Sequence, residues 1–386
     1  MGDTGIPCTI KGIKYVSFHG MSGYGTAARS YLRGLRNVGI PITWTPMVPG
    51  KAWRIGYQPF LGTEIEDPEL FPLCNIQIEY DTLIVHTVPE YYPMWARKEP
   101  GKRLIGYTVW ETDRIPDHWP GLLNKMDHLL VPTHWNKRVF ENCGVITPID
   151  VVPHTIGETT PQECETPWEK EPDEYVFYTI GAWTARKAIW NTIRSYLKTF
   201  TAQDATVLVI KTTSKDFTQR NFPGHSRDTA RAVQRIVTSY PNPAKIRLIT
   251  DELDEEDMVK LHLRGDCYVS LCRSEGWGLG TFDAAGHGNP VIITGFGGQV
   301  EYLPRDLALL VNYKIVPVSD RMGKASYSKN QNWGEPDVLH ASRLMRWAFE
   351  HRTEAKAKGE KLKKHVRENF SENVVIGKLI SAIAGA

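Results

Sequence analysis

Two series of short apolar runs, separated by stretches with helical spacing, constrain the fold of this chain more than any other feature. The runs are rich in β-branched and aromatic residues, as in strands that are buried on both faces of a sheet. Strands that alternate with helices form parallel sheets with helices on both faces. The pattern therefore predicts two doubly wound α/β domains. The first series covers residues 14–18, 42–45, 83–86, 103–109, 128–132 and 149–152, and the second covers 175–180, 205–211, 246–249, 267–271, 290–294 and 308–311.

The two series are separated by a segment with the composition of an exposed linker. Residues 158–174 include seven acidic residues, one lysine and three prolines, which disfavours burial and regular structure. We therefore predict an N-terminal domain over residues 1–157, a linker over 158–174, a C-terminal domain over 175–352 and C-terminal helices over 353–386.

Two local patterns refine this plan. An apolar stripe at Ala28, Leu32, Leu35 and Val38 has helical spacing and is followed by Gly39. This predicts a helix after the first strand, with the glycine as its C-terminal cap. Residues 314–336 show weak periodicity and many Ser, Asn, Gly and Pro residues, so we predict an irregular loop or insertion there.

Composition argues against several classes of protein. The 386 residues carry a net charge of +2, so no bulk charge requires a nucleic acid or an anionic membrane as partner. No apolar stretch approaches the roughly 20 residues that span a bilayer, and no signal peptide is indicated. The six cysteines contain no C-x-x-C pair, which favours reduced thiols and a cytoplasmic location. The 12 histidines show no metal-ligand spacing, so we expect no metal.

The most informative segment runs from Ser274 to Asp283, directly after a predicted strand, and contains three glycines and two carboxylates. It has the form of a strand, a glycine-rich turn and a helix. Glycines let the backbone approach a ligand closely, and amides at a helix start can bind a diphosphate. The carboxylates of Glu275 and Asp283 suit the hydroxyls of a sugar and a ribose better than a phosphate. Capping of the helix by these carboxylates is the structural alternative.

This segment resembles the E-x7-E signature of retaining glycosyltransferases with the GT-B fold, in the large family 4 (glycosyl transferase group 1). The second Glu of the signature is Asp283 here, one methylene shorter, and the proline after the Gly-Leu pair is Gly280. Other segments resemble the family in the same order along the chain. They are the glycine loop at 20–25, the passage at 131–145 with the following turn at His154, and the turn at Gly297 and Gly298.

The loop after the first strand of the second domain both matches the family and departs from it. Residues 181–187 are similar to the family's phosphate loop, which has an Arg directly after the first Gly and a Lys near the end. Ala182 stands at the Arg position and Lys187 at the Lys position. Arg186 is a candidate substitute for the missing Arg, because a guanidinium binds phosphate well.

The carboxyl ends of two predicted strands in the first domain supply further candidates. His86 and Glu111, the latter close to Asp113 and Arg114, lie where open α/β sheets bind ligands. A packed histidine and a local ion pair are the structural alternative. Several Trp residues are candidate sugar platforms, although most Trp residues in proteins are packing residues.

The resemblance implies an α/β protein of the GT-B type, with two Rossmann-like doubly wound domains facing a cleft and the last helix returning to the first domain. It implies retaining transfer of a sugar from a nucleotide sugar, with UDP- or GDP-sugars favoured, and no cofactor or metal. The candidate catalytic residues are Glu275, Glu111 and His86. The candidate donor-binding residues are Arg186, Lys187, Gly276, Trp277, Gly278, Leu279, Gly280, Thr281, Asp283, Gly23, Gly25 and His154.

The acceptor and several other functions stay open at this point. A glycan, lipid, protein, small molecule or modified nucleic-acid base are all acceptor classes, and peripheral membrane association stays open too. A non-catalytic GT-B scaffold or binding protein would explain the departures at Ala182 and Asp283. A nucleotide-sugar epimerase or hydrolase would use the same donor site.

An NAD-dependent oxidoreductase is a weaker alternative. Gly23, Gly25 and Ala28 fit the G-x-G-x-x-A fingerprint, but residues 43–47 lack the acidic residue that this fingerprint requires about 20 positions on.

Overall fold

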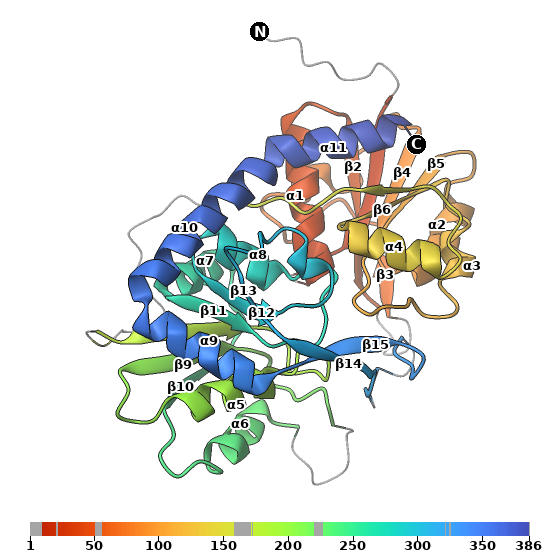
Figure 1. Ribbon diagram of the computed structural model, residues 1–386. Helices are drawn as coiled ribbons and strands as arrows, with labels where there is room; N and C mark the ends of the chain where they lie inside the picture. Colours follow the sequence, from red (N-terminus) through yellow and green to blue (C-terminus); the bar gives the residue numbers. More distant parts are fainter. Residues whose placement is uncertain are drawn as a thin grey trace. The chain divides into compact units, whose positions relative to one another are not determined.

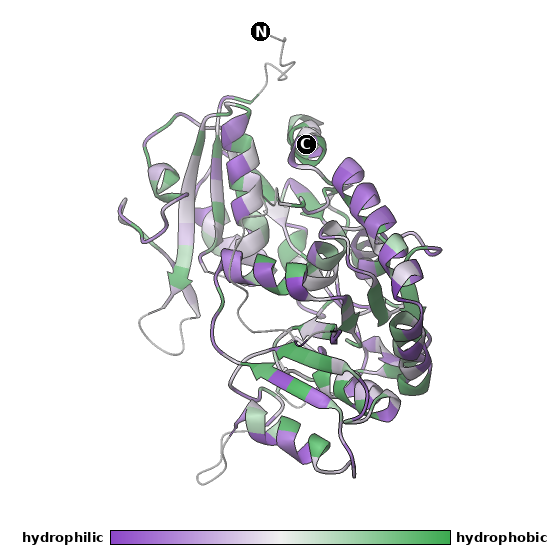
Figure 2. Cartoon of the chain, turned by 90° about the vertical axis from the view of Figure 1, so that its left-hand side faces the viewer, coloured by the Kyte–Doolittle hydropathy of each residue, from purple (hydrophilic) through white to green (hydrophobic). Residues whose placement is uncertain are grey.

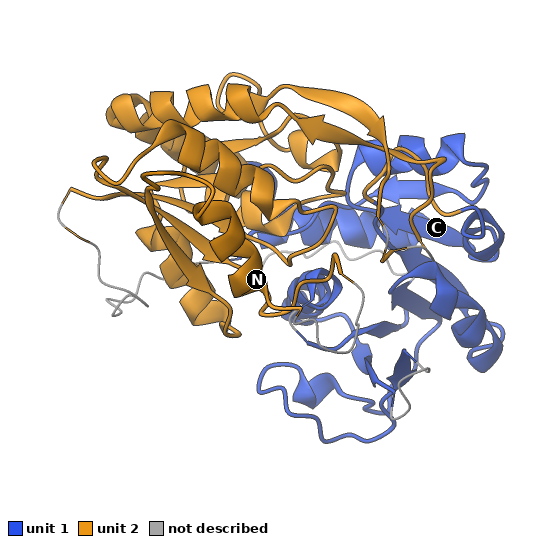
Figure 3. Cartoon of the chain, turned by 90° about the horizontal axis from the view of Figure 1, so that it is seen from below, with its two compact units in different colours: residues 1–110, 117–157, 369–386 blue, residues 111–116, 158–368 orange. Residues whose placement is uncertain are grey.

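The computed structural model describes residues 10–20, 22–50, 56–157, 171, 173–219, 227–320, 322–323 and 326–385. The chain forms two compact units (Figure 3). Unit 1 comprises Met1–Trp110, Asp117–Gly157 and Asn369–Ala386, and unit 2 comprises Glu111–Pro116 and Glu158–Glu368. Most of the predicted linker 158–174 lies outside the described residues.

Unit 1 contains a seven-stranded sheet with the order β3-β2-β1-β4-β5-β6-β7. The strands pair in parallel, except that the short β3 runs antiparallel to β2. The strands are β1 (Ile13–Phe18), β2 (Ile42–Pro49), β3 (Tyr57–Pro59), β4 (Thr82–His86), β5 (Arg103–Tyr107), β6 (His128–Val131) and β7 (Ile149–Val151). The helices are α1 (Gly23–Asn37), α2 (Tyr92–Lys98), α3 (Pro120–Leu123), α4 (His134–Asn142) and α11 (Glu372–Gly385), with short 3₁₀ turns at Phe71–Leu73 and Pro89–Tyr91.

Helix α1 forms where the apolar stripe predicts it. The Ser22 hydroxyl accepts a hydrogen bond from the Gly25 amide at the N-terminus of the helix. Gly39 follows the helix with a φ of +79°, as expected of a glycine cap. Leu32 and Leu35 are buried in the core of unit 1.

The last helix, α11, is part of unit 1 although it is encoded at the far end of the sequence. Val375, Ile376, Leu379 and Ile383 are buried in the same core as α1. At Gly34 the two helices approach so closely that a Cβ atom would lie 2.3 Å from Cγ1 of Ile376. The core of unit 1 therefore depends on both ends of the chain.

Unit 2 contains a six-stranded sheet with the order β10-β9-β8-β11-β12-β13 and a separate hairpin, β14-β15 (Figure 1). All the pairings in the six-stranded sheet are parallel. The strands are β8 (Tyr175–Ile180), β9 (Thr206–Lys211), β10 (Lys245–Ile249), β11 (Cys267–Ser270), β12 (Val291–Thr294), β13 (Leu309–Val311), β14 (Tyr313–Pro317) and β15 (Asn332–Pro336). The helices are α5 (Ile189–Thr199), α6 (Thr229–Val237), α7 (Glu255–Arg264), α8 (Leu279–Gly286), α9 (Val338–Glu350) and α10 (Arg352–Asn369), with a 3₁₀ turn at Gly298–Val300.

Each sheet is covered by helices with one apolar face. Figure 2 shows hydrophobic stretches in many of the strands and a mixture of hydrophilic and hydrophobic residues along the helices. In unit 2, Ile193 of α5 and Met345 of α9 are buried in the same core as Leu208 and Val269 of the sheet. Both units are therefore doubly wound α/β folds, as predicted. No helix within the described residues is both long and apolar enough to span a membrane.

Two expectations about the chain are wrong. The predicted irregular region 314–336 contains most of the β14-β15 hairpin, which pairs in antiparallel register from Tyr313 with Pro336 to Pro317 with Asn332. Strand β14 is mostly exposed, so its sequence carries no apolar alternation. The segment Glu111–Pro116, expected in the N-terminal domain, groups with unit 2, because its acidic side chains bond to residues of that unit.

Candidate functional site

The largest cluster of predicted site residues lies at the carboxyl edge of the sheet in unit 2. It is built from the loops that follow β8, β11 and β12, together with the segment Glu111–Pro116. This is the edge at which open parallel sheets bind ligands.

Glu275 is the centre of this cluster. Its Oε2 accepts a hydrogen bond from Nη1 of Arg186 at 2.7 Å, and its Oε1 accepts one from Nζ of Lys187. Nη2 of Arg186 also lies 3.2 Å from Oε1 of Glu111. Two cations and two carboxylates, predicted as separate site residues, are thus in direct contact.

The electrostatics of the cluster follow from burial and pairing. Glu275 is only 7% exposed. Burial alone would raise the pKa of the Glu275 carboxyl, but Arg186 and Lys187 hold this pKa below its ordinary value. Burial opposes the charge of Arg186, whereas Glu111 and Glu275 raise the pKa of its guanidinium. Glu275 is therefore ionised at neutral pH.

Backbone contacts fix the position of Glu275. The Gly298 amide donates to the carbonyl of Glu275 at 2.8 Å. Gly297 has a φ of +91°, and a Cβ atom there would lie 2.6 Å from the same carbonyl oxygen. Only glycine fits this position without a shift of the backbone. The two glycines after β12 thus hold the loop after β11 in place.

The segment Glu111–Pro116 is held against this cluster by its acidic side chains. Oη of Tyr327 donates to Oε2 of Glu111 at 3.2 Å, and the Ser274 hydroxyl donates to the carbonyl of Glu111. Two residues on, Asp113 accepts hydrogen bonds from the backbone and side-chain amides of Asn332 at 2.6 and 2.8 Å.

Helix α8 begins at the cluster with no side chain capping its N-terminus. Gly278, the residue before the helix, has a φ of +85°. Leu279, Gly280 and Thr281 form the first turn, and a Cβ atom at Gly280 would lie 2.7 Å from Oη of Tyr268. Glycine at 280 therefore lets the helix start approach the sheet closely. Unpaired amides at a helix start form an anion site.

Trp277 faces the interior of unit 2. Its ring packs 4.9 Å from the ring of Phe282 and 4.6 Å from that of Tyr302, and the residue is 4% exposed. Its neighbour Gly276 is buried as well. Among the other Trp residues considered as sugar platforms, Trp110, Trp119 and Trp183 are also buried. The structure gives them packing roles.

Asp283 lies in the second turn of α8, and its carboxylate forms no hydrogen bond or ion pair with any described residue. Burial, with a smaller contribution from Glu255, raises the pKa of this carboxyl to about 7. Neither Asp283 nor Glu275 caps α8, so the structural alternative of capping is wrong. A poorly solvated carboxylate without a partner is suited to accept hydrogen bonds from a ligand.

Two candidates of the first domain, His86 and His154, lie in an aromatic cluster of unit 1. Nδ1 of His86 lies 2.9 Å from Oη of Tyr15, and its ring stacks on Tyr107 at 4.2 Å. Nδ1 of His154 lies 2.9 Å from Oη of Tyr31. Burial lowers the pKa of His86 well below its ordinary value and that of His154 to about 3. Both imidazoles are therefore neutral at physiological pH.

Gly23 and Gly25 lie in the first turn of α1 rather than in a loop. A Cβ atom at Gly25 would lie 2.0 Å from the carbonyl oxygen of Gly20. The glycine at 25 is thus required by the close approach of the chain to itself.

Several residues of the cluster were not predicted as site residues. Tyr327 comes from the region predicted to be irregular, and Ser274 precedes the recognised glutamate. Ser274 is the first residue of the most informative segment but was not assigned a role there, and Tyr327 stands in no local pattern that marks it. The glycine pair at Gly297 and Gly298 is visible in the sequence. Only the structure shows that these glycines contact the backbone of Glu275.

Comparison with known proteins gave one family match and a set of similar solved structures. Residues 202–379 match the model of a family described as family 4 glycosyltransferase in conflict systems. The matched residues include Glu275 and Asp283, whereas Arg186 and Lys187 precede them. No curated protein matches the chain.

Solved structures resemble the chain over most of its length. Sucrose-phosphate synthase from Thermosynechococcus elongatus has a TM-score of 0.67 at 12% identity, over 97% of this chain and 98% of that one. HepE from Anabaena, solved with UDP and glucose, has a TM-score of 0.63 at 11% identity, over 97% and 100% of the two chains. TarM from S. aureus, solved with UDP among its ligands, has a TM-score of 0.57 at 12% identity, over 78% of this chain and 55% of that one.

At such low identity these likenesses concern the fold, which is the GT-B arrangement of two Rossmann-like domains that the sequence predicts. The family match covers residues 202–379, a range that includes Glu275 and Asp283. The chain thus has the GT-B fold, and its residues 202–379 match the model of a family described as family 4 glycosyltransferase in conflict systems.

Proposed function

We propose that the protein is a retaining glycosyltransferase that moves a sugar from a nucleotide sugar, a UDP- or GDP-sugar, to an acceptor hydroxyl. The observation that carries this proposal is the contact of Glu275 with Arg186 and Lys187 beside the uncapped N-terminus of α8. A carboxylate for hydroxyls, two cations and free helix amides are the groups that a sugar diphosphate requires. UDP and UDP-glucose bound to HepE support a uridine donor.

Each part of the donor has a suitable partner at this edge. The diphosphate would lie at the start of α8, within reach of Arg186 and Lys187. The unpartnered carboxylate of Asp283 would accept hydrogen bonds from the ribose, and Glu275 from the sugar hydroxyls. This placement combines the unpartnered carboxylate of Asp283 and the uncapped start of α8 with Glu275, Arg186 and Lys187, which are paired with one another.

The reaction requires stabilisation of the departing diphosphate and of positive charge at the anomeric carbon. The bond from the anomeric carbon to the phosphate oxygen breaks as the acceptor oxygen attacks from the same face, which retains the configuration. The acceptor proton passes to an oxygen of the departing phosphate. The two cations and the helix amides stabilise the phosphate charge, so no protein nucleophile is needed.

Binding of a nucleotide-sugar panel tests this proposal. We expect the thermal midpoint of the purified protein to rise with UDP- or GDP-sugars and not with NAD or NADP. A rise with NAD or NADP alone would favour the oxidoreductase alternative. The absence of any rise would favour a scaffold with a degenerate site.

A further inference from the structure

The two cations of the predicted phosphate loop are already matched by carboxylates of the protein. Arg186 contacts Glu111 and Glu275, and Lys187 contacts Glu275. Two positive and two negative side chains leave the cluster with no formal net charge. A diphosphate carries negative charge on both phosphates, so its binding calls for a further positive group.

Lys211, at the carboxyl edge of the same sheet, is a candidate for such a group. It is the last residue of β9, next to β8, and is in register with Ile180. Its carbonyl accepts a hydrogen bond at 3.0 Å from the amide of Gly181, the glycine that precedes Ala182. A Cβ atom at Gly181 would lie 3.4 Å from Cδ of Lys187. The backbone of Lys211 and the side chain of Lys187 therefore both lie beside Gly181 at the carboxyl edge of the sheet.

The ammonium of Lys211 has no carboxylate within ion-pair distance in the described part of the chain. Its one hydrogen bond there is a long one, 3.4 Å from Nζ to the carbonyl of Thr212. Burial lowers the pKa of this ammonium, and the more distant carboxylates of Glu252 and Asp251, in the loop after β10, only partly oppose this shift. A partly buried ammonium without a close counter-ion costs free energy, which a bound anion would offset.

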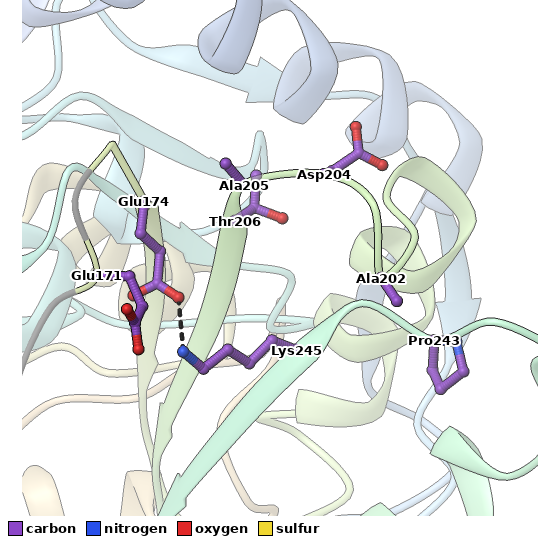
Figure 4. Close-up of a pocket in the computed structure, with 8 residues that line it drawn as sticks. All are labelled: Glu171, Glu174, Ala202, Asp204, Ala205, Thr206, Pro243 and Lys245. Atoms are coloured by element: carbon purple, nitrogen blue, oxygen red, sulfur yellow. Dashed lines mark hydrogen bonds and ion pairs between the residues drawn. The ribbon is translucent and has the colours of Figure 1, made fainter.

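The opposite edge of the same sheet provides a contrast. A pocket of about 280 Å³ lies there, and Figure 4 shows Lys245 and Glu174 among the residues that line it. Nζ of Lys245 lies 2.9 Å from Oε1 of the buried Glu174. The ammonium of Lys245 is therefore paired with a carboxylate of the protein, whereas the ammonium of Lys211 has no carboxylate within ion-pair distance among the described residues.

We propose that Lys211 binds the diphosphate of the donor and supplies the positive charge that Ala182, at the family's arginine position, cannot provide. This proposal rests on the proposed function, because it concerns the same donor site. It makes Lys211 a binding residue rather than a catalytic one.

The proposal is tested by measuring how variants at Lys211 bind UDP, GDP and uridine. Calorimetry measures the binding of UDP and GDP, and NMR measures the binding of uridine. Lys211→Met keeps the length of the side chain and removes its charge, and we expect it to weaken binding of the preferred diphosphate about 10- to 100-fold. The salt dependence of binding should also become less steep. Binding of uridine should be unchanged, and Lys211→Arg should retain most of the affinity.

The controls separate this proposal from a general loss of structure. Lys245→Met removes a cation from the opposite edge and should leave affinity for the diphosphate unchanged. Equal affinity of the wild-type protein and Lys211→Met for the diphosphate would overturn the role of Lys211 and leave the proposed function standing. An equal loss of uridine binding would also overturn it, because the lysine would then serve the nucleoside or the fold. A wild-type protein that binds neither UDP nor GDP would overturn both proposals.

Discussion

At the scale of single residues, Glu275 combines a structural and a chemical requirement. A carboxylate that is only 7% exposed is stable in the folded protein because Arg186 and Lys187 contact it. The same contacts present two cations and a carboxylate on one side of the helix start. The loss of this one side chain therefore has consequences for both stability and activity.

For Glu275→Ala we expect kcat/KM to fall at least about 100-fold, the scale of losing a contact made in the transition state. The thermal midpoint should fall too, because two partly buried cations lose a partner. Glu174→Ala is the matched control, since it breaks a buried ion pair at the opposite edge of the sheet. It should lower stability and leave kcat/KM near the wild-type value. A kcat/KM unchanged in Glu275→Ala would refute the role of this residue.

For Asp283 the raised pKa predicts a pH dependence of donor binding. The carboxyl has a pKa of about 7, against an ordinary value of 3.8, because of burial and Glu255. Ribose hydroxyls donate to the ionised form, so donor affinity should rise as pH increases through 7. In Asp283→Asn the KM for the donor should rise and this pH dependence should disappear. A variant that changes kcat alone would contradict the ribose contact.

The same shift predicts a dependence of stability on pH. Because the folded state binds the Asp283 proton more tightly than the unfolded state does, the free energy of unfolding should fall as pH rises from about 4 to about 7. Asp283→Asn should therefore be more stable than the wild-type protein above pH 7, by roughly 1 to 3 kcal/mol. The two proteins should converge below pH 4. Urea unfolding at a series of pH values measures this, and a difference that does not vary with pH would contradict the raised pKa.

At the scale of elements, the start of α8 is set by its backbone. Gly278 has a φ of +85°, which L side chains rarely adopt. Gly39, after α1, has a similar φ of +79°, and a Cβ atom there would have no neighbouring atom within 4 Å. The two glycines therefore share the conformational constraint but differ in what surrounds them.

Replacing each of these glycines by alanine distinguishes the effect of backbone strain on stability from an effect on donor binding. Gly278→Ala and Gly39→Ala should each lower the free energy of unfolding by about 1 kcal/mol. Only Gly278→Ala should weaken donor binding as well, because it moves the amides at the start of α8. Calorimetric titration of both variants provides the comparison. Equal donor affinity in the two variants would argue against a diphosphate at this helix start.

The elements that the sequence predicted and those that it missed differ in burial. The twelve expected strands of the two sheets all form. They could be predicted because most of their residues are buried, and buried strands have apolar sequences. The β14-β15 hairpin was missed because β14 is mostly exposed. The position of Glu111 beside Arg186 was missed because an ion pair between residues 75 positions apart leaves no local pattern. The E-x7-E spacing, in contrast, is local, and so Glu275 and Asp283 could be identified.

At the scale of the whole molecule, the chain leaves unit 1 and returns to it with α11. The family resemblance predicted that the last helix returns to the first domain. It did not predict the packing of Ile376 against Gly34, because these residues lie far apart in the sequence. Likewise, the sequence did not predict that Glu111–Pro116 belongs to unit 2. Its contacts with Arg186 and Asn332 join residues that are far apart in the sequence.

The dependence of unit 1 on α11 predicts the effect of a charge at that helix. Ile376→Asp places a carboxylate at a position that is 1% exposed in the core of unit 1, and should lower the free energy of unfolding by about 3 to 5 kcal/mol. Hydrogen exchange should show lost protection in α1 and α11. Lys378→Asp, at an exposed position of the same helix, is the control and should change little. Full protection of α1 in Ile376→Asp would show that unit 1 folds without α11.

The central claim is that this protein transfers the sugar of a nucleotide sugar with retention of configuration. Proton NMR of the purified enzyme with the UDP- or GDP-sugar that binds best, with water as the acceptor, tests it most directly. We predict slow release of the nucleoside diphosphate, with the free sugar appearing first in the anomeric configuration of the donor, and loss of this turnover in Glu275→Ala. First appearance of the opposite anomer, or a bound donor that is never consumed, would contradict the claim.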